Sequence, residues 1–284
     1  MGALPSFRKE HDMSVTQSLQ ALRDRLKASD KMPVVFLGHG SPMNAIEDTQ
    51  YSRSWRELGK ALPRPQAILV VSAHWMTRGT TLVDVSQFPR TIYDFYGFPD
   101  ELYQQSYPAE GSPEMAKEVI SLLGSHHVEG DDTWGLDHGA WTVLKFLYPN
   151  ADVPVFQLSI DMAADLSHHV QIGRELAALR HRGVLILGSG NIVHNLRTMR
   201  FGAKPYDWAL EFDQTFARNL EARNMDALAD RAGLGNLLRM AHPSVDHYLP
   251  ALTIAGAADA KDELVFMNDT IDIASVSMRS FVFY

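Results

Sequence analysis

Three apolar runs of strand length each break, at their C-terminal end, into Gly, Ser or Asn beside a histidine. They are VVFLGHGSP with His39, ILVVSAHW with His74, and VLILGSGNIVHNL with His194. Runs of Leu and β-branched residues are typical of strands. In an open α/β sheet, ligands bind beyond the carboxyl ends of the strands, where residues distant in sequence converge. The three histidines therefore predict a functional site at one edge of a sheet.

Strand candidates alternate with helix candidates from Pro33 onward. The strand candidates are 34–38, 67–73, 81–85, 153–160, 184–189, 264–267 and 275–283. The helix candidates are 52–61, 112–124, 139–147, 166–182, 207–222 and 247–257. This alternation predicts a single α/β domain with a central, mostly parallel sheet flanked by helices. The irregular, aromatic-rich stretch 86–110 is typical of a functional loop or a lid.

The N-terminal segment 1–31 is expected to be a helical or disordered appendage to a catalytic domain of residues 32–284. Its apolar residues have helical spacing, with Ser14 as a candidate N-cap. It lacks the uninterrupted apolar core of a signal peptide. No apolar stretch reaches the roughly 18 residues that span a bilayer. We therefore expect a cytoplasmic protein without a membrane partner.

The composition narrows the chemistry of the site. The 284 residues include 12 histidines and no cysteine, which excludes disulfides, thiolate nucleophiles and Cys-ligated metals. A bound metal must therefore be held by His, Asp, Glu or backbone oxygen. The net charge of −8 argues against a nucleic-acid partner, because phosphate binding favours a basic face. Imidazole is the commonest neutral metal ligand, so several histidines at one sheet edge suggest a metal-dependent enzyme.

Other histidines fall outside the strand ends. His138 in WGLDHGAW lies at an expected helix N-terminus, where Asp137 can cap the helix and a neutral imidazole is favoured. His247 in AHPSVDHYLPAL is expected to open a helix, with Asp246 more plausible as its cap than as a partner of the imidazole. Taken singly, each of these histidines is as well explained by packing or hydrogen bonding. Five are expected to be solvated: His126, His127, His168, His169 and His181.

Common catalytic motifs are missing from the chain. GHGSP and GSGNI do not match the G-x-S-x-G turn of α/β-hydrolases, and no H-E-x-x-H zinc motif occurs. Val193 occupies the third glycine position of a dinucleotide-binding fingerprint. The remaining hypothesis is a mononuclear metal site built from dispersed histidines.

Eight ordered segments resemble a known family. They are GHGSPMNAIED, LPRPQAILVVSAHW, YDFYGFP, YPAEGSP, WGLDHGAW with VLKFLYP, VPVFQLSID, GSGNIVHNLR and DHYLP. Together they resemble the class III extradiol ring-cleavage dioxygenases of the LigB type, and within them the DOPA dioxygenase branch. The resemblance covers residues 33–284 and implies a catechol substrate such as L-DOPA, molecular oxygen and one divalent metal ion.

The resemblance also implies roles for individual histidines. His39 and His74 match the first two metal ligands, and His247 takes the place of a carboxylate ligand found elsewhere in the superfamily. His194 matches a histidine that acts as an acid–base group with iron and as a further ligand with zinc. His138 matches a histidine that contacts substrate and dioxygen. Fe²⁺ is expected for turnover, although an all-histidine site also suits Zn²⁺.

Two competing functions remain open from the residues alone. One is a zinc hydrolase that uses a metal-bound hydroxide, which would act without oxygen. The other is a non-catalytic zinc-binding protein, whose metal would have no open coordination position. The sequence leaves open the physiological catechol, the bond that is cleaved and the oligomeric state.

Overall fold

An eight-stranded sheet forms the centre of the computed structural model, which describes residues 31–284. The strand order is β4 (Val128–Asp131), β3 (Thr81–Asp84), β5 (Val155–Asp161), β2 (Ala67–Thr77), β6 (Val184–Gly190), β1 (Val34–Gly38), β10 (Ser280–Phe283) and β7 (Leu264–Met267). The neighbours β5, β2, β6 and β1 run parallel, whereas β3 is antiparallel to β5 and β10 is antiparallel to β1 and β7. The expected single α/β domain with a mostly parallel sheet is confirmed. The helix expected within residues 1–31 lies outside the described residues.

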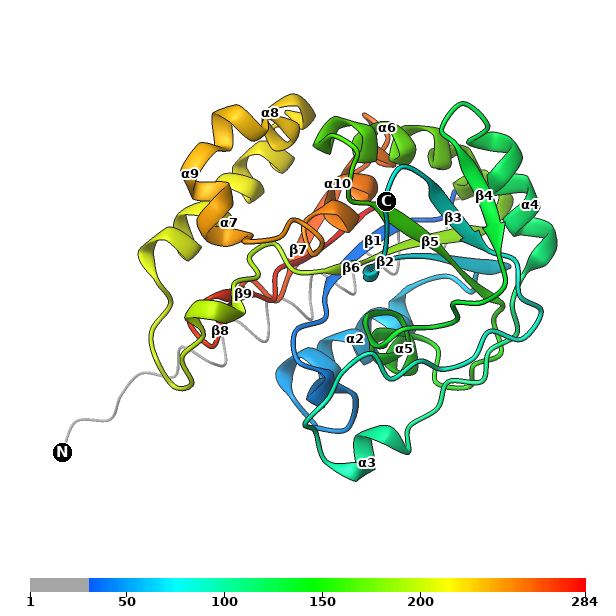
Figure 1. Cartoon of the computed structure of the whole chain (residues 1–284), viewed down its shortest axis with the longest axis horizontal. Coiled ribbons are helices and arrows are strands. Elements are labelled where there is room, and N and C mark those ends of the chain that lie inside the picture. Colours follow the sequence, from blue (N-terminus) through cyan, green and yellow to red (C-terminus); the bar gives the residue numbers. More distant parts are fainter. Residues whose placement is uncertain (1–30) are drawn as a thin grey trace.

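Helices cover both faces of the sheet, because successive strand side chains point to opposite faces. Val35 and Leu37 belong to the core shared with α2 (Gln50–Ala61) and α5 (His138–Leu147). Val34 and Phe36 belong to the other core, which includes α4 (Pro113–Leu122), α6 (Leu166–Leu176) and α10 (Leu249–Gly256). Figure 1 shows α2 and α5 on one side of the sheet and α6 and α10 on the other. The parallel strands are buried on both faces, and for this reason their sequences are near-continuous apolar runs.

Local capping sets several helix ends. α2 begins two residues before the expected position, because Thr49 and Ser52 form a reciprocal capping box. α6 ends at Leu176 and continues as the 3₁₀-helix η2 (Ala177–Arg182), so the expected helix 166–182 is divided. α10 begins at Leu249, with a proline in its first turn. α7 (Asp207–Glu221) matches its expected range to within one residue.

The expected strand 275–283 is divided into two strands. Val276–Ser277 forms β9 and pairs with β8 (Ile271–Asp272), whereas Ser280–Phe283 forms β10 in the main sheet. Several short elements have no clear sequence period and were not expected: β4, α3 (Asp100–Tyr103), α8 (Met225–Ala229), α9 (Arg231–Ala241), and the 3₁₀-helices η1 (Pro42–Ala45) and η3 (Leu196–Thr198). In α9 the helical period is interrupted at Gly235, which has a φ of 50°.

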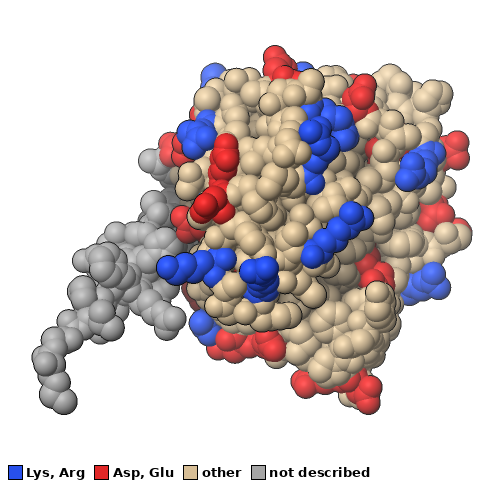
Figure 2. Space-filling model, turned by 60° about the vertical axis from the view of Figure 1, so that its left-hand side comes forward, with Lys and Arg blue, Asp and Glu red and all other residues tan. Residues whose placement is uncertain are grey.

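The surface carries both signs of charge. Figure 2 shows Lys and Arg side chains together with Asp and Glu side chains on one face, separated by large areas that carry neither. Within residues 31–284, no helix combines the length and the apolar character that crossing a membrane requires.

Candidate metal centre

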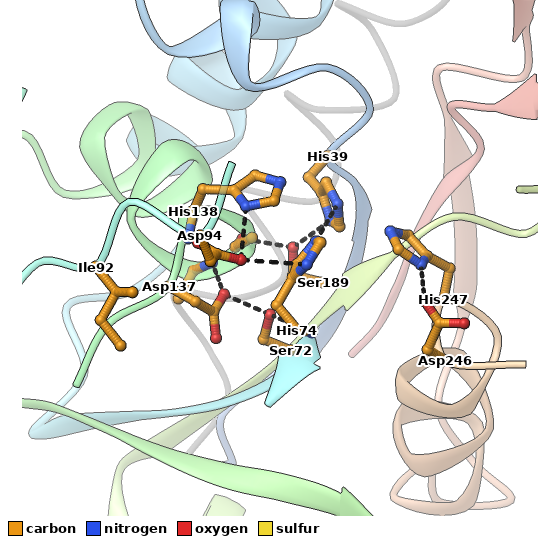
Figure 3. A network of polar contacts seen from close by, with 12 residues as sticks. His39, Ser72, His74, Ile92, Asp94, Asp137, His138, Ser189, Asp246 and His247 are labelled. Atoms are coloured by element: carbon orange, nitrogen blue, oxygen red, sulfur yellow. Dashed lines mark hydrogen bonds and ion pairs between the residues drawn. The ribbon is translucent and has the colours of Figure 1, made fainter. Parts of the chain in front are cut away.

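Three parallel strands bring their carboxyl ends to one place. Gly38 at the end of β1 pairs with Gly190 of β6, and Ser72 of β2 pairs with Ser189 of β6. His39 directly follows β1 and is 1% exposed. His74 lies two residues beyond Ser72, inside β2 rather than at its end, where the pairing with β5 is irregular. This irregularity lets the strand continue while the His74 imidazole points into the space beyond β1 and β6 (Figure 3).

His247 reaches the same place from the segment before α10. Its carbonyl accepts a hydrogen bond from the Asn191 N–H, with an N···O distance of 3.0 Å. Gly190 permits this approach, since a Cβ there would lie 2.3 Å from the His247 carbonyl oxygen. The glycine that ends β6 therefore places a histidine 57 residues further along the chain opposite His39 and His74 (Figure 3). His247 is 3% exposed.

His138 enters the site as the first residue of α5. As expected, Asp137 is the N-cap, and its side chain accepts a hydrogen bond from the Ala140 N–H at 3.1 Å. The Ser72 hydroxyl donates to the same carboxylate at 2.6 Å, which ties the helix start to β2. Burial raises the pKa of Asp137, and the nearby charge of Asp94 adds to this effect.

A carboxylate or hydroxyl oxygen holds the Nδ1 atom of each of four imidazoles. The Ser189 hydroxyl donates its single hydrogen to the Gly139 carbonyl at 2.5 Å, so it must accept from His39 Nδ1–H at 2.9 Å. Asp246 Oδ2 lies 2.6 Å from His247 Nδ1. Asp94 Oδ2 lies 3.2 Å from His74 Nδ1 and 2.9 Å from His138 Nδ1. The hydrogen bonds place a proton on Nδ1 of His39, His138 and His247, whereas the contact between His74 and Asp94 is at ion-pair distance and does not fix the His74 tautomer.

The Nε2 atoms of two rings meet in the centre of the site. His39 Nε2 and His74 Nε2 are 3.1 Å apart, and the centroid of the His247 ring lies 5.2 Å and 5.0 Å from theirs. Burial, with the neighbouring histidines, lowers the pKa of His74 to about 3 and those of His39 and His247 well below the ordinary value. All three imidazoles are therefore neutral at pH 7, in the form that binds a metal ion.

His194 differs from these four residues. Its ring stacks on that of His247 with a centroid distance of 3.5 Å and an interplanar angle of 6°. Its backbone N–H donates to the Ala241 carbonyl at 2.9 Å, and it forms a bridge with Val276. Within residues 31–284, no side-chain or backbone group accepts a hydrogen bond from the His194 imidazole. Burial lowers the pKa of His194 to about 4, opposed by the charge of Asp246.

The donor set fits a divalent transition-metal ion. Two nitrogens that each lie about 2.0–2.1 Å from one zinc ion are roughly 3.3 Å apart in tetrahedral geometry, close to the 3.1 Å found between the two Nε2 atoms. Two groups have ligand atoms within 4.8 Å of one another: His39 with His74 and His138, and His194 with Asp246 and His247.

Comparison with known proteins identifies the family. A family model described as "Catalytic LigB subunit of aromatic ring-opening dioxygenase" matches residues 32–278. The chain belongs to this family. Membership makes the LigB-family chain an oxidoreductase.

Individual relatives cover nearly the whole chain. The protein named "4,5-DOPA dioxygenase extradiol" of Escherichia coli (strain K12) is 45% identical over 267 residues, which are 91% of this chain and 97% of the relative. The protein of the same name from Beta vulgaris is 38% identical over 87% of this chain and 95% of its own length. A crystal structure of an uncharacterised Escherichia coli K12 protein superposes with a TM-score of 0.75 at 40% identity, covering 89% of this chain and 99% of that one.

In this LigB-family chain, the structure contradicts the sequence-based interpretations of Asp246 and His169. Asp246 does not cap α10: the N-cap is Tyr248, and the Asp246 carboxylate holds His247 instead. His169 is not solvated but 3% exposed, and its Nε2–H donates to the Asp161 carbonyl at 3.2 Å. Both residues lie near the start of a helix, and the local sequence pattern does not indicate which way their side chains point. His127 and His181 are exposed, as expected, whereas His126 and His168 are half-buried, and His126 Nε2 lies 2.9 Å from Glu175 Oε1.

Sequence reasoning missed Asp94 altogether. This residue lies in the irregular aromatic stretch, where neither a strand end nor a helix start indicates a site. The only signal was its position in YDFYGFP, one of the segments that carry the family resemblance. Trp75, the neighbour of His74 in the chain, is 3% exposed and stacks on Trp134 at 5.9 Å between centroids.

Acidification is expected to destabilise the metal-free protein in a defined pH range. Burial lowers the pKa of His169 to about 4, whereas the unfolded chain binds the proton near pH 6.5. Between these values the unfolded state holds more protons, so stability falls as the pH falls from 6.5 towards 4. For His169 alone, the loss amounts to about 2 kcal/mol at pH 5. Urea unfolding at pH 7 and pH 5 measures this loss of unfolding free energy. Between the two pH values, His169→Gln should lose about 2 kcal/mol less unfolding free energy than the wild type. An equal loss in both proteins would contradict this assignment.

Proposed function

We propose that this protein is a metal-dependent extradiol dioxygenase that opens the ring of a catechol such as L-DOPA with molecular oxygen. The observation that carries the proposal is the pair of Nε2 atoms of His39 and His74, which are 3.1 Å apart in a buried cluster of histidines. Family membership supports the ring-opening chemistry. The names of the relatives support a DOPA-like catechol.

His39, His74 and His247 are proposed as the ligands of one divalent ion. Each is neutral at pH 7 and has an oxygen atom 2.6–3.2 Å from its Nδ1, the side on which most metal-binding histidines contact an acceptor. Three protein ligands leave coordination positions for substrate atoms. When bound, Fe²⁺ supplies the electronic path between an electron-rich catechol and dioxygen. Zn²⁺ suits the same ligands but has no accessible redox chemistry.

His138 and His194 are proposed as the proton-transferring residues. A catechol is a better electron donor after it loses a hydroxyl proton, so a neutral imidazole beside the hydroxyl groups is needed. His138 is proposed for this role because Asp94 Oδ2 accepts a hydrogen bond from its Nδ1, which leaves Nε2 as the nitrogen available to a substrate hydroxyl. His194 has no acceptor for either ring nitrogen among the described residues, so we favour proton transfer over metal binding for this side chain.

The aromatic loop, defined here as residues 93–107, is proposed to shield the reaction from water. Phe95 packs edge-on against the His138 ring with a centroid distance of 5.6 Å and also contacts Phe98 and Tyr103. An apolar wall excludes water, which strengthens the electrostatic interactions of the catechol and limits side reactions.

One preparation in four conditions tests the proposed function. The metal-free protein is loaded with Fe²⁺ under anaerobic conditions or with Zn²⁺, and each form is given L-DOPA with and without oxygen. We expect oxygen uptake and a yellow semialdehyde product only with Fe²⁺ and oxygen, because ring opening consumes one O₂ and leaves a conjugated product. Activity of the zinc form on an ester or amide without oxygen would instead support a metal-dependent hydrolase.

A further inference from the structure

We propose that Asp94 is a positioning residue that sets the orientation of a metal ligand and of a proton-transferring histidine with one carboxylate group. The inference rests on the proposed function for the roles of His74 and His138. Asp94 lies between β3 and α3, in the aromatic loop, and its side chain is 16% exposed. Its carboxylate turns away from solvent and into the histidine cluster (Figure 3).

Three nitrogen atoms converge on this carboxylate. Oδ1 accepts the backbone N–H of His138 at 2.8 Å, and Oδ2 lies at hydrogen-bond distance, 2.9 Å, from His138 Nδ1 and at ion-pair distance, 3.2 Å, from His74 Nδ1. An ionised carboxylate accepts hydrogen bonds and donates none. His138 must therefore carry a proton on Nδ1 in this hydrogen bond, and a proton on His74 Nδ1 is favoured by the same oxygen. In the proposal, one side chain thus biases the tautomer of two histidines.

Neither of the other two buried carboxylates near the site can replace Asp94. Asp137 accepts from Ser72, the Trp134 indole and Gln157, and contacts no imidazole nitrogen. Asp246 holds only His247. The rings of His74 and His138 are 3.9 Å apart between centroids, so one oxygen can reach both. Within residues 31–284, Asp94 is the one carboxylate that joins two imidazoles.

Asp94 also connects the chemistry to the aromatic loop. The hydrogen bond from the His138 backbone fixes the loop to the first turn of α5, and the next residue, Phe95, packs edge-on against the His138 ring. His138 is therefore held between a carboxylate and an aromatic edge that belong to adjacent residues. If the aromatic loop moved away from the site, Asp94 and Phe95 would both leave the His138 ring. The ring is therefore oriented for proton transfer only while the loop covers it.

Asp94→Asn tests the proposal with little change in shape. The amide oxygen can still accept the His138 backbone N–H, but the NH₂ group that replaces the second oxygen cannot accept from either imidazole. Asp132→Asn, at an exposed carboxylate in the segment before α5, is the matched control. Circular dichroism and thermal unfolding establish that each variant is folded. The readouts are zinc affinity by chelator competition, the side-chain ¹⁵N shifts of His74 and His138, and kcat and KM for L-DOPA with Fe²⁺.

In the wild type we expect the His138 proton on Nδ1. In Asp94→Asn we expect this proton to redistribute between the two nitrogens, and zinc affinity to fall roughly 10- to 100-fold, as is typical when a ligand loses its hydrogen-bond acceptor. The kcat at saturating Fe²⁺ should fall about 10- to 100-fold, with KM changed much less. Asp132→Asn should match the wild type in every readout.

Two results would overturn the proposal. One is a wild-type His138 that carries its proton on Nε2, a measurement that needs no variant. The other is an Asp94→Asn protein whose zinc affinity and imidazole tautomers match those of Asp132→Asn. Zinc affinity and ¹⁵N shifts do not depend on turnover. If the wild type fails to cleave catechols while these two readouts change as expected, the proposed function is wrong but the positioning role of Asp94 stands.

Discussion

His39→Ala and His74→Ala variants are expected to purify without a bound metal ion and to lose roughly 10³-fold or more of their turnover. Each substitution removes one of the two Nε2 atoms that lie 3.1 Å apart, and the remaining ligands cannot close the coordination of the ion. The apolar parts of β1 and β2 are untouched, so the fold should persist. Metal analysis by mass spectrometry, together with oxygen uptake in the presence of L-DOPA and added Fe²⁺, measures both effects.

The matched control for these variants is His181→Ala, since His181 is exposed and lies outside the histidine cluster. It should retain the metal and the activity of the wild type. His247→Ala should behave like the two ligand variants, because its Nδ1 is held by Asp246 in the same way. Full metal occupancy in His39→Ala and His74→Ala would show that the ion is held elsewhere.

His138→Gln is expected to keep its metal and its fold while turnover falls by about 10²–10⁴-fold, the range for a positioned acid–base group. Glutamine keeps a similar reach and hydrogen-bonding ability but cannot take up a proton. The measurement is kcat at saturating Fe²⁺ and L-DOPA, with metal content determined on the same sample. KM should change less than kcat, because the substitution acts on the chemical step.

The same variant distinguishes between two arrangements of the ligands. His138 has a ligand atom within 4.8 Å of those of His39 and His74, so it is within reach of a shared ion. If His138→Gln loses its metal, His138 is a ligand and the proton transfer falls to His194. His194→Gln should then retain metal and lose turnover. If His194→Gln loses metal instead, stacking on His247 does not exclude His194 from coordination.

The strands and their histidines could be predicted because their signals are local. A run such as VLILG is apolar on both faces, which in a soluble protein indicates a buried parallel strand. Parallel strands place their carboxyl ends at one edge, so the convergence of His39 and His74 follows from the sheet type. The N-cap role of Asp137 was predictable for the same reason, since capping involves residues three apart.

Asp94 and Asp246 could not be assigned from local patterns. Asp94 contacts histidines 20 and 44 residues away, and no periodicity in the aromatic loop indicates which way its side chain points. Asp246 stands where a helix cap would stand, but the chain turns so that its carboxylate faces the neighbouring imidazole. Burial of His169 likewise depends on packing between β5 and α6.

The sequence by itself determined the fold class, the family and the histidines that form the centre, because hydrophobic runs, strand-end glycines and ordered motifs are properties of the chain. Only the tertiary structure decided which nitrogen of each imidazole is free. That choice depends on acceptors that folding brings to each ring: Ser189 for His39, Asp94 for His138, and Asp246 for His247. A hydrogen bond has a direction that residue type does not specify, so the chemistry of the centre was settled by folding.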